Sequence, residues 1–393
     1  MKTFHAERLE ALNTNYFTVL GELIAAQENR GRSVVRLDIG SPDLMPPPAV
    51  IARLKSSVLK SDSHGYQSHR GISSLRRAWA DHYLDLYGVK LDPEREILPL
   101  IGTKEGIFHL SQALIDPGDL VLVPDPGYQT YLAGAVFSGG QVHPVPCSSA
   151  AQFIRHLKTL PEQTLQRAKL LWVNFPHNPT GATAAREHFL KLAKLARQYR
   201  IVLCHDSAYA RVTYDGYQAP SLLETTADDQ PVLEFNSLSK SHNMAGWRMG
   251  AAVGSPGLIQ ALHLLKTHAD SGHFLPVLEA AVEALRGDPG WIEERNHRYR
   301  KRRNLAVRSL REMGITIDPP RGGLYLWFPI PGEIPSRKCV RQLVEIAGVA
   351  LTPGSIFGDN GEGFLRLSLT SPLPELREGM ERLADGFARL ARG

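Results

Sequence analysis

Apolar strand-like runs alternate with helix-like segments through the middle of this chain, and that alternation restricts its fold more than any other feature. The predicted strands comprise residues 97–100, 120–123, 170–173 and 201–205, with helices opening near Thr103 and Tyr128 and another over 185–199. Such alternation is typical of a mostly parallel sheet covered by helices, in which ligands bind at the carboxyl ends of the strands. We therefore predict an α/β fold whose site residues directly follow the strands.

The length of the chain predicts more than one hydrophobic core. A chain of 393 residues exceeds the size at which a single core stops growing, about 250–300 residues. The pattern changes in the C-terminal part, where a basic helix is followed by strand-like segments at 322–328 and 364–369. We predict a large domain over residues 46–289 and a smaller domain formed by an N-terminal arm, residues 1–45, together with residues 290–393.

The chain is mildly basic, with a formal net charge of +5 and a pI near 9.0. Much of the excess lies in residues 295–311, which include Arg298, Arg302 and Arg303. A nucleic-acid-binding patch would explain such a stretch, but no recognition motif accompanies it. Charged runs of this kind usually form the hydrated face of a helix, so we predict an exposed helix face and no nucleic-acid partner.

The cysteines and apolar runs give no sign of a metal site, export or membrane insertion. Cys147, Cys204 and Cys339 are far apart and lack metal-ligand spacing, which predicts free thiols in a reducing cytoplasm. Charged residues occupy the N-terminal segment where a signal peptide would need an apolar core. No apolar run approaches about 18 residues, so we predict a cytoplasmic protein without membrane contact.

Lys240 follows a predicted strand at 232–235 and is preceded by Ser237 and Ser239, while Arg248 follows eight residues later. An isolated lysine in such a setting is usually a solvated loop residue. The combination, however, suits a Schiff base between the lysine amine and the aldehyde of pyridoxal phosphate (PLP). The hydroxyls and the guanidinium would hold the phosphate.

Two further motifs supply groups that this cofactor needs. Asn178 lies in an Asn-Pro-Thr-Gly sequence, and Asp206 and Tyr209 lie in an Asp-Ser-Ala-Tyr sequence after a predicted strand. Together with the Lys240 motif, they make the chain resemble a class I/II aminotransferase of the fold-type I PLP family over essentially its whole length. The resemblance implies a three-layer α/β/α large domain with a mostly parallel sheet and a smaller α+β domain.

The phosphate of the cofactor calls for anion-binding groups. Gly102, Thr103 and Lys104 follow a predicted strand and open a helix whose N-terminus would attract an anion. A Gly-Thr sequence is also a common helix cap. By resemblance, the phosphate site also includes Ser237, Ser239 and Arg248.

The ring of the cofactor requires a carboxylate at its nitrogen, because only a protonated ring withdraws electrons strongly. Asp206 is the candidate, although an acid at a strand end often caps a helix. By resemblance, Asn178 and Tyr209 contact the phenolate oxygen, and Tyr128 stacks on the ring. The resemblance therefore assigns catalysis to Lys240, Asp206 and Tyr209.

The α-carboxylate of the substrate requires a bidentate arginine. Arg366 lies in an Arg-Leu-Ser sequence and alternates with leucines, so it projects from the opposite face of its strand. By resemblance, Arg366, Asn178 and the backbone of Gly40 bind this carboxylate. Lys104 and Arg70 are candidates for the distal end of the substrate because they neighbour the cofactor motifs.

Two segments indicate a partner subunit. Tyr66 resembles the tyrosine that reaches the phosphate of the neighbouring subunit's cofactor, and residues 270–273 resemble the family segment that crosses to the partner. The resemblance therefore implies a homodimer with shared active sites. Members strict for aspartate tend to offer an arginine in that segment, and its absence here argues against strict aspartate specificity.

The resemblance implies transfer of an amino group from an L-amino acid to a 2-oxo acid by a ping-pong mechanism. The motifs are most similar to the branch that includes LL-diaminopimelate, alanine and related bacterial aminotransferases, and we favour LL-diaminopimelate as donor. Alanine, aspartate and aromatic donors stay open. A carbon-sulfur β-lyase would keep the same cofactor groups. A PLP-sensing transcriptional regulator would need a DNA-binding domain, which the residues before Gly40 are too few to form.

Overall fold

The computed structural model describes residues 4, 6–10, 16–226 and 230–392. The expectation that no signal peptide begins the chain concerns residues 1–8, of which 1–3 and 5 lie outside the described residues. None of the described helices combines the length and the apolar character needed to cross a membrane. All three cysteines are free, as the sequence predicts, and their side chains are buried.

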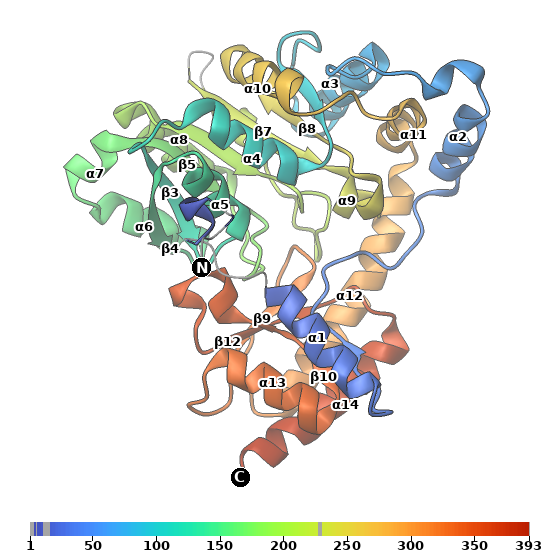
Figure 1. Ribbon diagram of the computed structural model, residues 1–393, viewed down its shortest axis with the longest axis vertical. Helices are drawn as coiled ribbons and strands as arrows, with labels where there is room; N and C mark the ends of the chain where they lie inside the picture. Colours follow the sequence, from blue (N-terminus) through green and yellow to red (C-terminus); the bar gives the residue numbers. More distant parts are fainter. Residues whose placement is uncertain (1–3, 5, 11–15, 227–229, 393) are drawn as a thin grey trace.

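A seven-stranded sheet forms the centre of the molecule, with strand order β2-β8-β7-β6-β5-β3-β4 (Figure 1). β8 runs antiparallel to β2 and β7, and the other neighbouring pairs are parallel. The strands are β2 Ile97–Leu100, β3 Leu120–Asp125, β4 Gln141–Pro146, β5 Ala168–Val173, β6 Val202–Asp206, β7 Val232–Ser237 and β8 Gly250–Gly254. The prediction of a mostly parallel sheet is confirmed.

Side chains alternate between the two faces of this sheet, because successive residues of a strand point in opposite directions. Leu171 and Val173 of β5 face a core beneath α6, α7 and α8, whereas Leu170 and Trp172 face a core with α4, α5 and α10. The bounds are α4 Thr103–Leu114, α5 Gln129–Phe137, α6 Ala150–Thr159, α7 Glu162–Arg167, α8 Arg186–Tyr199 and α10 Pro256–Ala269. Helices thus cover both faces, as the three-layer prediction requires.

A third core lies at the β2 edge of the sheet. It contains Trp79, Tyr83 and Leu278, which pack with β2 and β8. The helices around it are α2 Pro48–Val58, α3 Ser73–Tyr87 and α11 Leu275–Arg286. The chain between α2 and α3 carries Tyr66 on the outside of the molecule, where the side chain is 96% exposed.

A separate core lies at the bottom of Figure 1 and contains the C-terminal part of the chain. Three antiparallel strands, β9, β11 and β12, form one small sheet, and β1 pairs with β10. The elements are α1 Tyr16–Glu28, β1 Val35–Arg36, β9 Tyr325–Pro329, α13 Ser336–Ala347, β10 Val349–Ala350, β11 Thr352–Pro353, β12 Phe364–Ser368 and α14 Leu373–Leu390. N-terminal and C-terminal residues share this core, while the domain boundaries at residues 46 and 289 stay a prediction.

The predicted basic helix is α12 (Pro289–Glu312), which runs from the layer beside the large sheet to the C-terminal core (Figure 1). The prediction that its charges form a hydrated face is wrong for Arg295, Arg302 and Arg303, which are buried. Arg302 makes two hydrogen bonds of 2.7 Å to the Asp43 carboxylate. Burial is possible because carbonyl and carboxylate oxygens from distant parts of the chain accept hydrogen bonds from these guanidinium groups.

Candidate active site

A cavity of about 540 Å³ lies where the carboxyl ends of β5, β6 and β7 meet β1, β9 and β12. Its wall contains most of the residues that the sequence predicts for the cofactor and the substrate. Those that line it are Gly40, Thr103, Lys104, Tyr128, Asn178, Asp206, Tyr209, Ser237, Ser239, Lys240, Arg248 and Arg366. Side chains from both ends of the chain thus meet at one place.

A larger cavity, of about 880 Å³, opens between α3, α12 and the loop after Tyr209. Its wall includes Arg211, Tyr217 and Glu293. None of the predicted cofactor or substrate residues lines it. The side chains that carry chemistry therefore converge in the smaller cavity, in spite of its lesser volume.

Lys240 extends into the cavity from the short helix α9 (Leu238–Ser241), which begins directly after β7. The Ser237 hydroxyl caps this helix by accepting a hydrogen bond from the Ser239 amide at 3.2 Å. The Lys240 amine donates to the Gly40 carbonyl at 2.6 Å. Burial lowers the pKa of this amine below its ordinary value, which favours the neutral, nucleophilic form.

Arg295 of α12 holds the backbone around Lys240 from behind. Its buried guanidinium donates to the Lys240 carbonyl at 2.6 Å, to the Ser241 carbonyl, and to the Arg211 carbonyl at 2.6 Å. Burial lowers the pKa of Arg295 to about 10, which leaves the group charged at neutral pH. These bonds fix the lysine turn relative to the loop that follows Tyr209.

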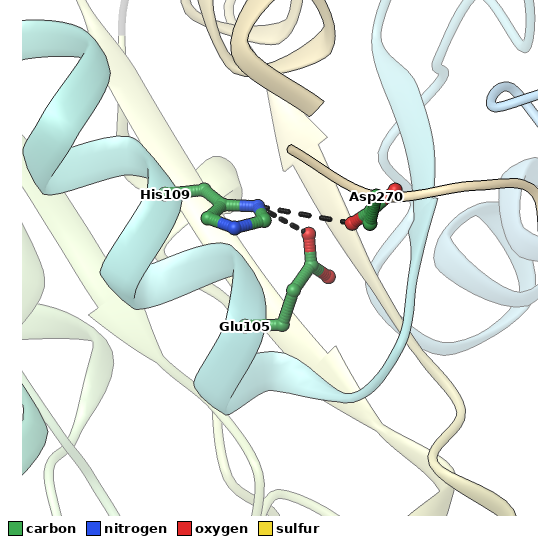
Figure 2. Close-up of side chains that lie close together, drawn as sticks. All are labelled: Glu105, His109 and Asp270. Atoms are coloured by element: carbon green, nitrogen blue, oxygen red, sulfur yellow. Dashed lines mark ion pairs between the residues drawn. The ribbon is translucent and has the colours of Figure 1, made fainter. Parts of the chain in front are cut away.

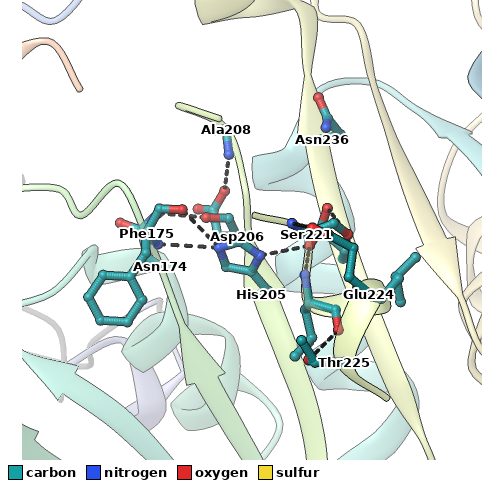
Figure 3. Close-up of polar contacts among 12 residues, drawn as sticks. Asn174, Phe175, His205, Asp206, Ala208, Ser221, Glu224, Thr225 and Asn236 are labelled. Carbon is teal, nitrogen blue, oxygen red and sulfur yellow. Dashed lines mark hydrogen bonds and ion pairs between the residues drawn. The ribbon is translucent and has the colours of Figure 1, made fainter. Parts of the chain in front are cut away.

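Asp206 is the last residue of β6, and its carboxylate points into the cavity. It accepts a hydrogen bond from the Tyr131 hydroxyl at 2.8 Å. It accepts a second one from the Ala208 amide at 3.3 Å (Figure 3). Asn174 donates to its backbone carbonyl at 2.6 Å. Burial raises the pKa of Asp206, and the Tyr131 hydrogen bond opposes that shift. A cationic partner in the cavity would relieve this buried charge.

A buried polar network fixes the strand ends beneath Asp206, and Figure 3 shows part of it. The His205 ring contacts the Glu234 carboxylate at 2.8 Å and the Phe175 carbonyl at 3.0 Å. Glu234 also accepts a hydrogen bond from the Tyr83 hydroxyl at 2.7 Å. Because the network joins the ends of β5 and β6 to β7, it holds the two strands that carry the acid and the lysine in a fixed relation.

Another side of the cavity gathers groups that suit an anion. α4 begins at Thr103, and Gly102 before it has a φ of 77°. A Cβ at Gly102 would lie 2.3 Å from Nη2 of Arg248, so glycine leaves room for that guanidinium. Nη1 of Arg248 lies 3.5 Å from the Ser239 hydroxyl. The first turn of α4, the serine and the arginine thus converge in the way a phosphate requires.

Glu105 fixes the turn that precedes α4, because one carboxylate oxygen accepts the Ile101 amide at 3.0 Å. The other oxygen contacts His109 at 2.7 Å and Lys266 at 3.4 Å, and Lys266 bonds Asp270 at 2.8 Å. Figure 2 shows Glu105, His109 and Asp270, whose ligand-type atoms lie within 4.8 Å of one another. The Lys266 ammonium pairs with both carboxylates, so the cluster serves as a structural link to the segment at Asp270.

Arg366 is buried on β12 and donates to the Asn178 side chain at 2.9 Å and to the Asp38 carbonyl at 3.0 Å. Its guanidinium carbon lies 4.0 Å from the centre of the Tyr325 ring. Among the described residues it has no carboxylate partner, and its Nε makes no hydrogen bond. A buried guanidinium in that state is suited to bind a carboxylate from outside the chain.

Tyr325 is a site residue that the sequence motifs do not single out. Its hydroxyl lies 3.1 Å from the Tyr209 hydroxyl. Burial raises the pKa of Tyr325, but the positive charges of Arg366 and Lys240, together with the hydrogen bond to Tyr209, outweigh burial and lower it below the ordinary value. A Cβ at Gly40 would lie 1.9 Å from the Tyr325 hydroxyl, so glycine is required beside this ring.

Tyr66 and Arg70 lie away from the cavity within this chain. Tyr66 is 96% exposed, and Arg70 donates to the Glu94 carbonyl at the surface. The loop that carries both residues contacts the segment at 270–273, since the His69 ring lies 3.0 Å from the Asp270 carbonyl. The two segments predicted to meet a partner subunit therefore lie side by side.

Comparison with known proteins identifies the family. The profile of the family described as "Aminotransferase class I and II" matches residues 32–383. The LL-diaminopimelate aminotransferase of Desulforudis audaxviator is 42% identical over 390 residues, which cover 99% of this chain and 100% of that protein. The enzyme of the same name from Moorella thermoacetica is 40% identical over 378 residues, covering 96% and 97% of the two chains.

Solved structures agree with this assignment. Substrate-bound BacF from Bacillus subtilis superposes with a TM-score of 0.92 at 33% identity and covers 98% of both chains. A probable N-succinyldiaminopimelate aminotransferase from Thermus thermophilus gives a TM-score of 0.89 at 35% identity, covering 95% of this chain and 100% of that one. The family and fold expected from the motifs are thus confirmed. Because these likenesses extend over nearly the whole chain, the protein belongs to the class I and II aminotransferase family.

Proposed function

We propose that this enzyme moves an amino group from an L-amino acid to a 2-oxo acid with PLP held in the smaller cavity, and that LL-diaminopimelate is its favoured donor. One observation carries the proposal. The Lys240 side chain is half-buried, its pKa is lowered by burial, and it shares the cavity with Asp206 and Arg248. This trio offers a nucleophilic amine, an acid for a ring nitrogen and a cation for a phosphate.

The remaining groups of the cavity fit the same cofactor. Arg248, Ser239 and the first turn of α4 suit its phosphate, and the buried Asp206 carboxylate suits a protonated ring nitrogen. The other cofactor groups that we assign are Gly102, Thr103, Lys104, Tyr128, Asn178, Tyr209 and Ser237. When bound, PLP supplies an electron sink for the charge left as the substrate loses its Cα proton.

Lys240 has two roles in this proposal. Its amine would hold the cofactor through the aldehyde, and, once freed by an incoming substrate amine, it would accept the proton from the substrate Cα. The lowered pKa supports both roles, since a larger fraction of the amine is neutral near pH 7 than for an exposed lysine. Arg295 holds the Lys240 carbonyl at 2.6 Å and so limits the movement of the lysine turn.

Arg366 would orient the substrate by binding its α-carboxylate as a two-pronged donor. Asn178 and Asp38 hold the guanidinium at 2.9 Å and 3.0 Å before any substrate arrives. The Gly40 carbonyl, which accepts the Lys240 amine at 2.6 Å, brings the same backbone segment next to the reacting atoms. Such preorganisation reduces the entropy lost on binding and aligns the Cα–H bond with the base.

The choice of LL-diaminopimelate rests on the relatives of this chain. Enzymes of that name are 42% and 40% identical to it over almost their whole length. A solved neighbour is described as a probable N-succinyldiaminopimelate aminotransferase. Both names describe donors with a carboxylate at the end distant from the reacting amino group, so a distal carboxylate is the common requirement.

We also propose a homodimer that shares its active sites across a two-fold axis. Tyr66 is 96% exposed although it is aromatic, and its loop lies against the segment at 270–273. A partner subunit would bring Tyr66 to the phosphate of the other cavity. Mixing Lys240→Ala chains with Tyr66→Phe chains should restore part of the activity, because the cavity of the Tyr66→Phe chain keeps Lys240 and Arg248 and receives an intact Tyr66 from its partner. Sedimentation that finds a fully active monomer would remove this part of the proposal.

A panel of amino donors tests the proposed function. Each donor is added to the cofactor-loaded protein with 2-oxoglutarate as acceptor, and glutamate formation is followed. LL-diaminopimelate should exceed alanine, aspartate and phenylalanine in kcat/KM by tenfold or more. Pyruvate and ammonia released from cystathionine without an oxo acid would instead identify a β-lyase. A tenfold preference for alanine or an aromatic donor would contradict the choice of donor and leave the amino transfer intact.

A further inference from the structure

We infer that Arg36 binds the distal carboxylate of the amino donor and thereby selects dicarboxylic substrates. The inference deepens the proposed function and rests on it. Arg36 belongs to β1 and lines the cavity, but it lies in no sequence motif that points to the cofactor. It is therefore a new candidate for specificity, distinct from the groups that perform the chemistry.

The cavity wall carries more positively charged side chains than carboxylates. Among the described residues, the positively charged side chains that line it are Arg36, Lys104, Lys240, Arg248 and Arg366, whereas the only lining carboxylate is Asp206. The cofactor engages Lys240 through its aldehyde and Arg248 through its phosphate, and the α-carboxylate engages Arg366. Lys104 belongs to the groups assigned to the phosphate, so Arg36 is the cation of the wall that neither the cofactor nor the α-carboxylate engages. Its pairing with Asp38 uses two of its five N–H donors, and a second substrate carboxylate would bind the others.

Arg36 is held ready for such a carboxylate. Its Nε and Nη2 donate to the two oxygens of Asp38, both at 2.7 Å. The Asp38 side chain is fully buried, while the Arg36 side chain is 37% exposed. Since guanidinium carries five N–H donors, three stay free on Arg36, and no described residue accepts them. Asp38 thus fixes one edge of the fork and raises the pKa of Arg36. A fork fixed in this way loses little entropy when its free donors bind an anion.

The position of Arg36 relative to Arg366 sets a length for the substrate. Asp38 bridges the two arginines, because its carbonyl accepts Arg366 at 3.0 Å and its carboxylate accepts Arg36 at 2.7 Å. Within one aspartate, the backbone carbonyl oxygen lies at most about 5 Å from a carboxylate oxygen. With the two hydrogen-bond lengths added, the bonded nitrogens of Arg366 and Arg36 lie no more than about 11 Å apart. An extended seven-carbon diacid separates its carboxylate carbons by about 7.5 Å, so it reaches both guanidinium groups.

Lys104 is the rival for this role. It lies on the first turn of α4, beside the groups assigned to the phosphate, whereas Arg36 and Arg366 lie on the same wall and share Asp38. A guanidinium also matches the two oxygens of a carboxylate better than an ammonium does. Both observations favour Arg36 over Lys104.

Calorimetric titration with two non-reacting acids tests the inference. Pimelate carries carboxylates at both ends of a seven-carbon chain, and heptanoate, the matched control, carries one. Each is titrated into the cofactor-loaded wild type and into Arg36→Gln, Arg36→Lys and Lys104→Gln. The wild type should bind pimelate about tenfold tighter than heptanoate, given a partly exposed bidentate pair. Arg36→Gln should abolish this preference while heptanoate affinity stays within about twofold of wild type.

Arg36→Lys should keep part of the preference because it leaves Asp38 with a cationic partner, and Lys104→Gln should keep all of it. The inference would be overturned if the wild type showed no preference for pimelate over heptanoate. It would also be overturned if Lys104→Gln lost the preference and Arg36→Gln kept it. An equal weakening of both acids by Arg36→Gln would also overturn it, because it would reveal a purely structural role.

Kinetics with a matched pair of donors separates this inference from the proposed function. L-2-aminopimelate and L-2-aminoheptanoate differ only in the distal carboxylate. If neither compound donates its amino group, the proposed function is refuted, regardless of how tightly pimelate and heptanoate bind. Transfer from both, with a preference for aminopimelate that survives in Arg36→Gln, would refute the role of Arg36 alone.

Discussion

The two walls of the active-site cavity are built in different ways. The wall from the seven-stranded sheet presents Asp206 and Lys240 directly at the ends of β6 and β7, and a buried network through His205 and Glu234 ties these strands together. The wall from the small sheets presents Arg366, whose position depends on side-chain and backbone contacts with residues far away in the sequence. The first wall is fixed by the sheet itself, the second by contacts between segments.

This difference indicates a division of work. Groups that bind the cofactor and move the proton need a position that does not change between substrates, and strand ends in a parallel sheet supply it. Groups that recognise the substrate lie on segments whose contacts can vary without disturbing the sheet. Changes in the first wall should therefore abolish chemistry, and changes in the second should alter affinity and specificity.

The largest effect is expected for Lys240→Ala in the sheet wall. Loss of both the nucleophile and the base should reduce turnover by about four powers of ten or more, while the circular dichroism spectrum stays unchanged. Lys191→Ala, at an exposed position of α8, is the matched control and should keep wild-type activity. If Lys240→Ala kept more than a tenth of the wild-type activity, the assignment of the chemistry to the sheet wall would lose its basis.

Asp206→Asn should have the next largest effect. The amide keeps the shape of the side chain but lacks the charge that keeps a ring nitrogen protonated, so kcat should fall by about three powers of ten. Tyr131→Phe removes only the 2.8 Å hydrogen bond to this carboxylate and should lower kcat far less. Stopped-flow measurement of a single half-reaction gives both values, and a near-wild-type rate for Asp206→Asn would mean that another acid serves the ring.

Arg366→Lys probes the opposite wall. The lysine keeps the charge but loses the two-pronged geometry, so KM should rise by about two powers of ten for all donors and acceptors alike. The cofactor should bind as in wild type, because the sheet wall is untouched. Steady-state kinetics with three donors checks this. A rise confined to one donor would show that Arg366 recognises a distal group.

The smallest effect concerns stability. The depressed pKa of Lys240 means that, from that pKa up to the ordinary value of 10.5, the unfolded chain binds one more proton than the folded chain. Stability of the cofactor-free protein therefore rises with pH across this window. Lys240→Met removes the contribution and should raise the melting temperature at pH 7 by about 2 °C or more, with a smaller gain at pH 10. If Lys240→Met melted at a lower temperature than the wild type at pH 7, the conclusion that burial of the charged amine costs stability would be contradicted.

The sequence predicts the two walls to different degrees, for a physical reason. Lys240, Asp206 and Asn178 follow apolar runs that read as strands, and the ends of parallel strands meet at one edge of a sheet, so their convergence follows from local patterns. Tyr131 donates a hydrogen bond to Asp206, which lies 75 positions further along the sequence, and the buried Asp38 orients Arg36. Such contacts depend on tertiary packing, which no local pattern records.

The prediction of a hydrated face for the basic stretch of α12 is wrong for the same reason. Arg302 is buried and meets Asp43, which lies 259 positions away and is itself partly exposed. A charged run on a helix is usually hydrated. Only the packing of distant segments on α12 reveals that three of its arginines are structural.

Borohydride reduction of the cofactor-loaded protein tests the central claim most directly. Reduction makes the bond between an amine and the cofactor aldehyde permanent, and digestion followed by mass spectrometry then locates it. The account predicts that the reduced cofactor is attached to the peptide containing Lys240, and that the Lys240→Ala protein carries none. Attachment to Lys104 or any other lysine, or no attachment in the wild type, would contradict it.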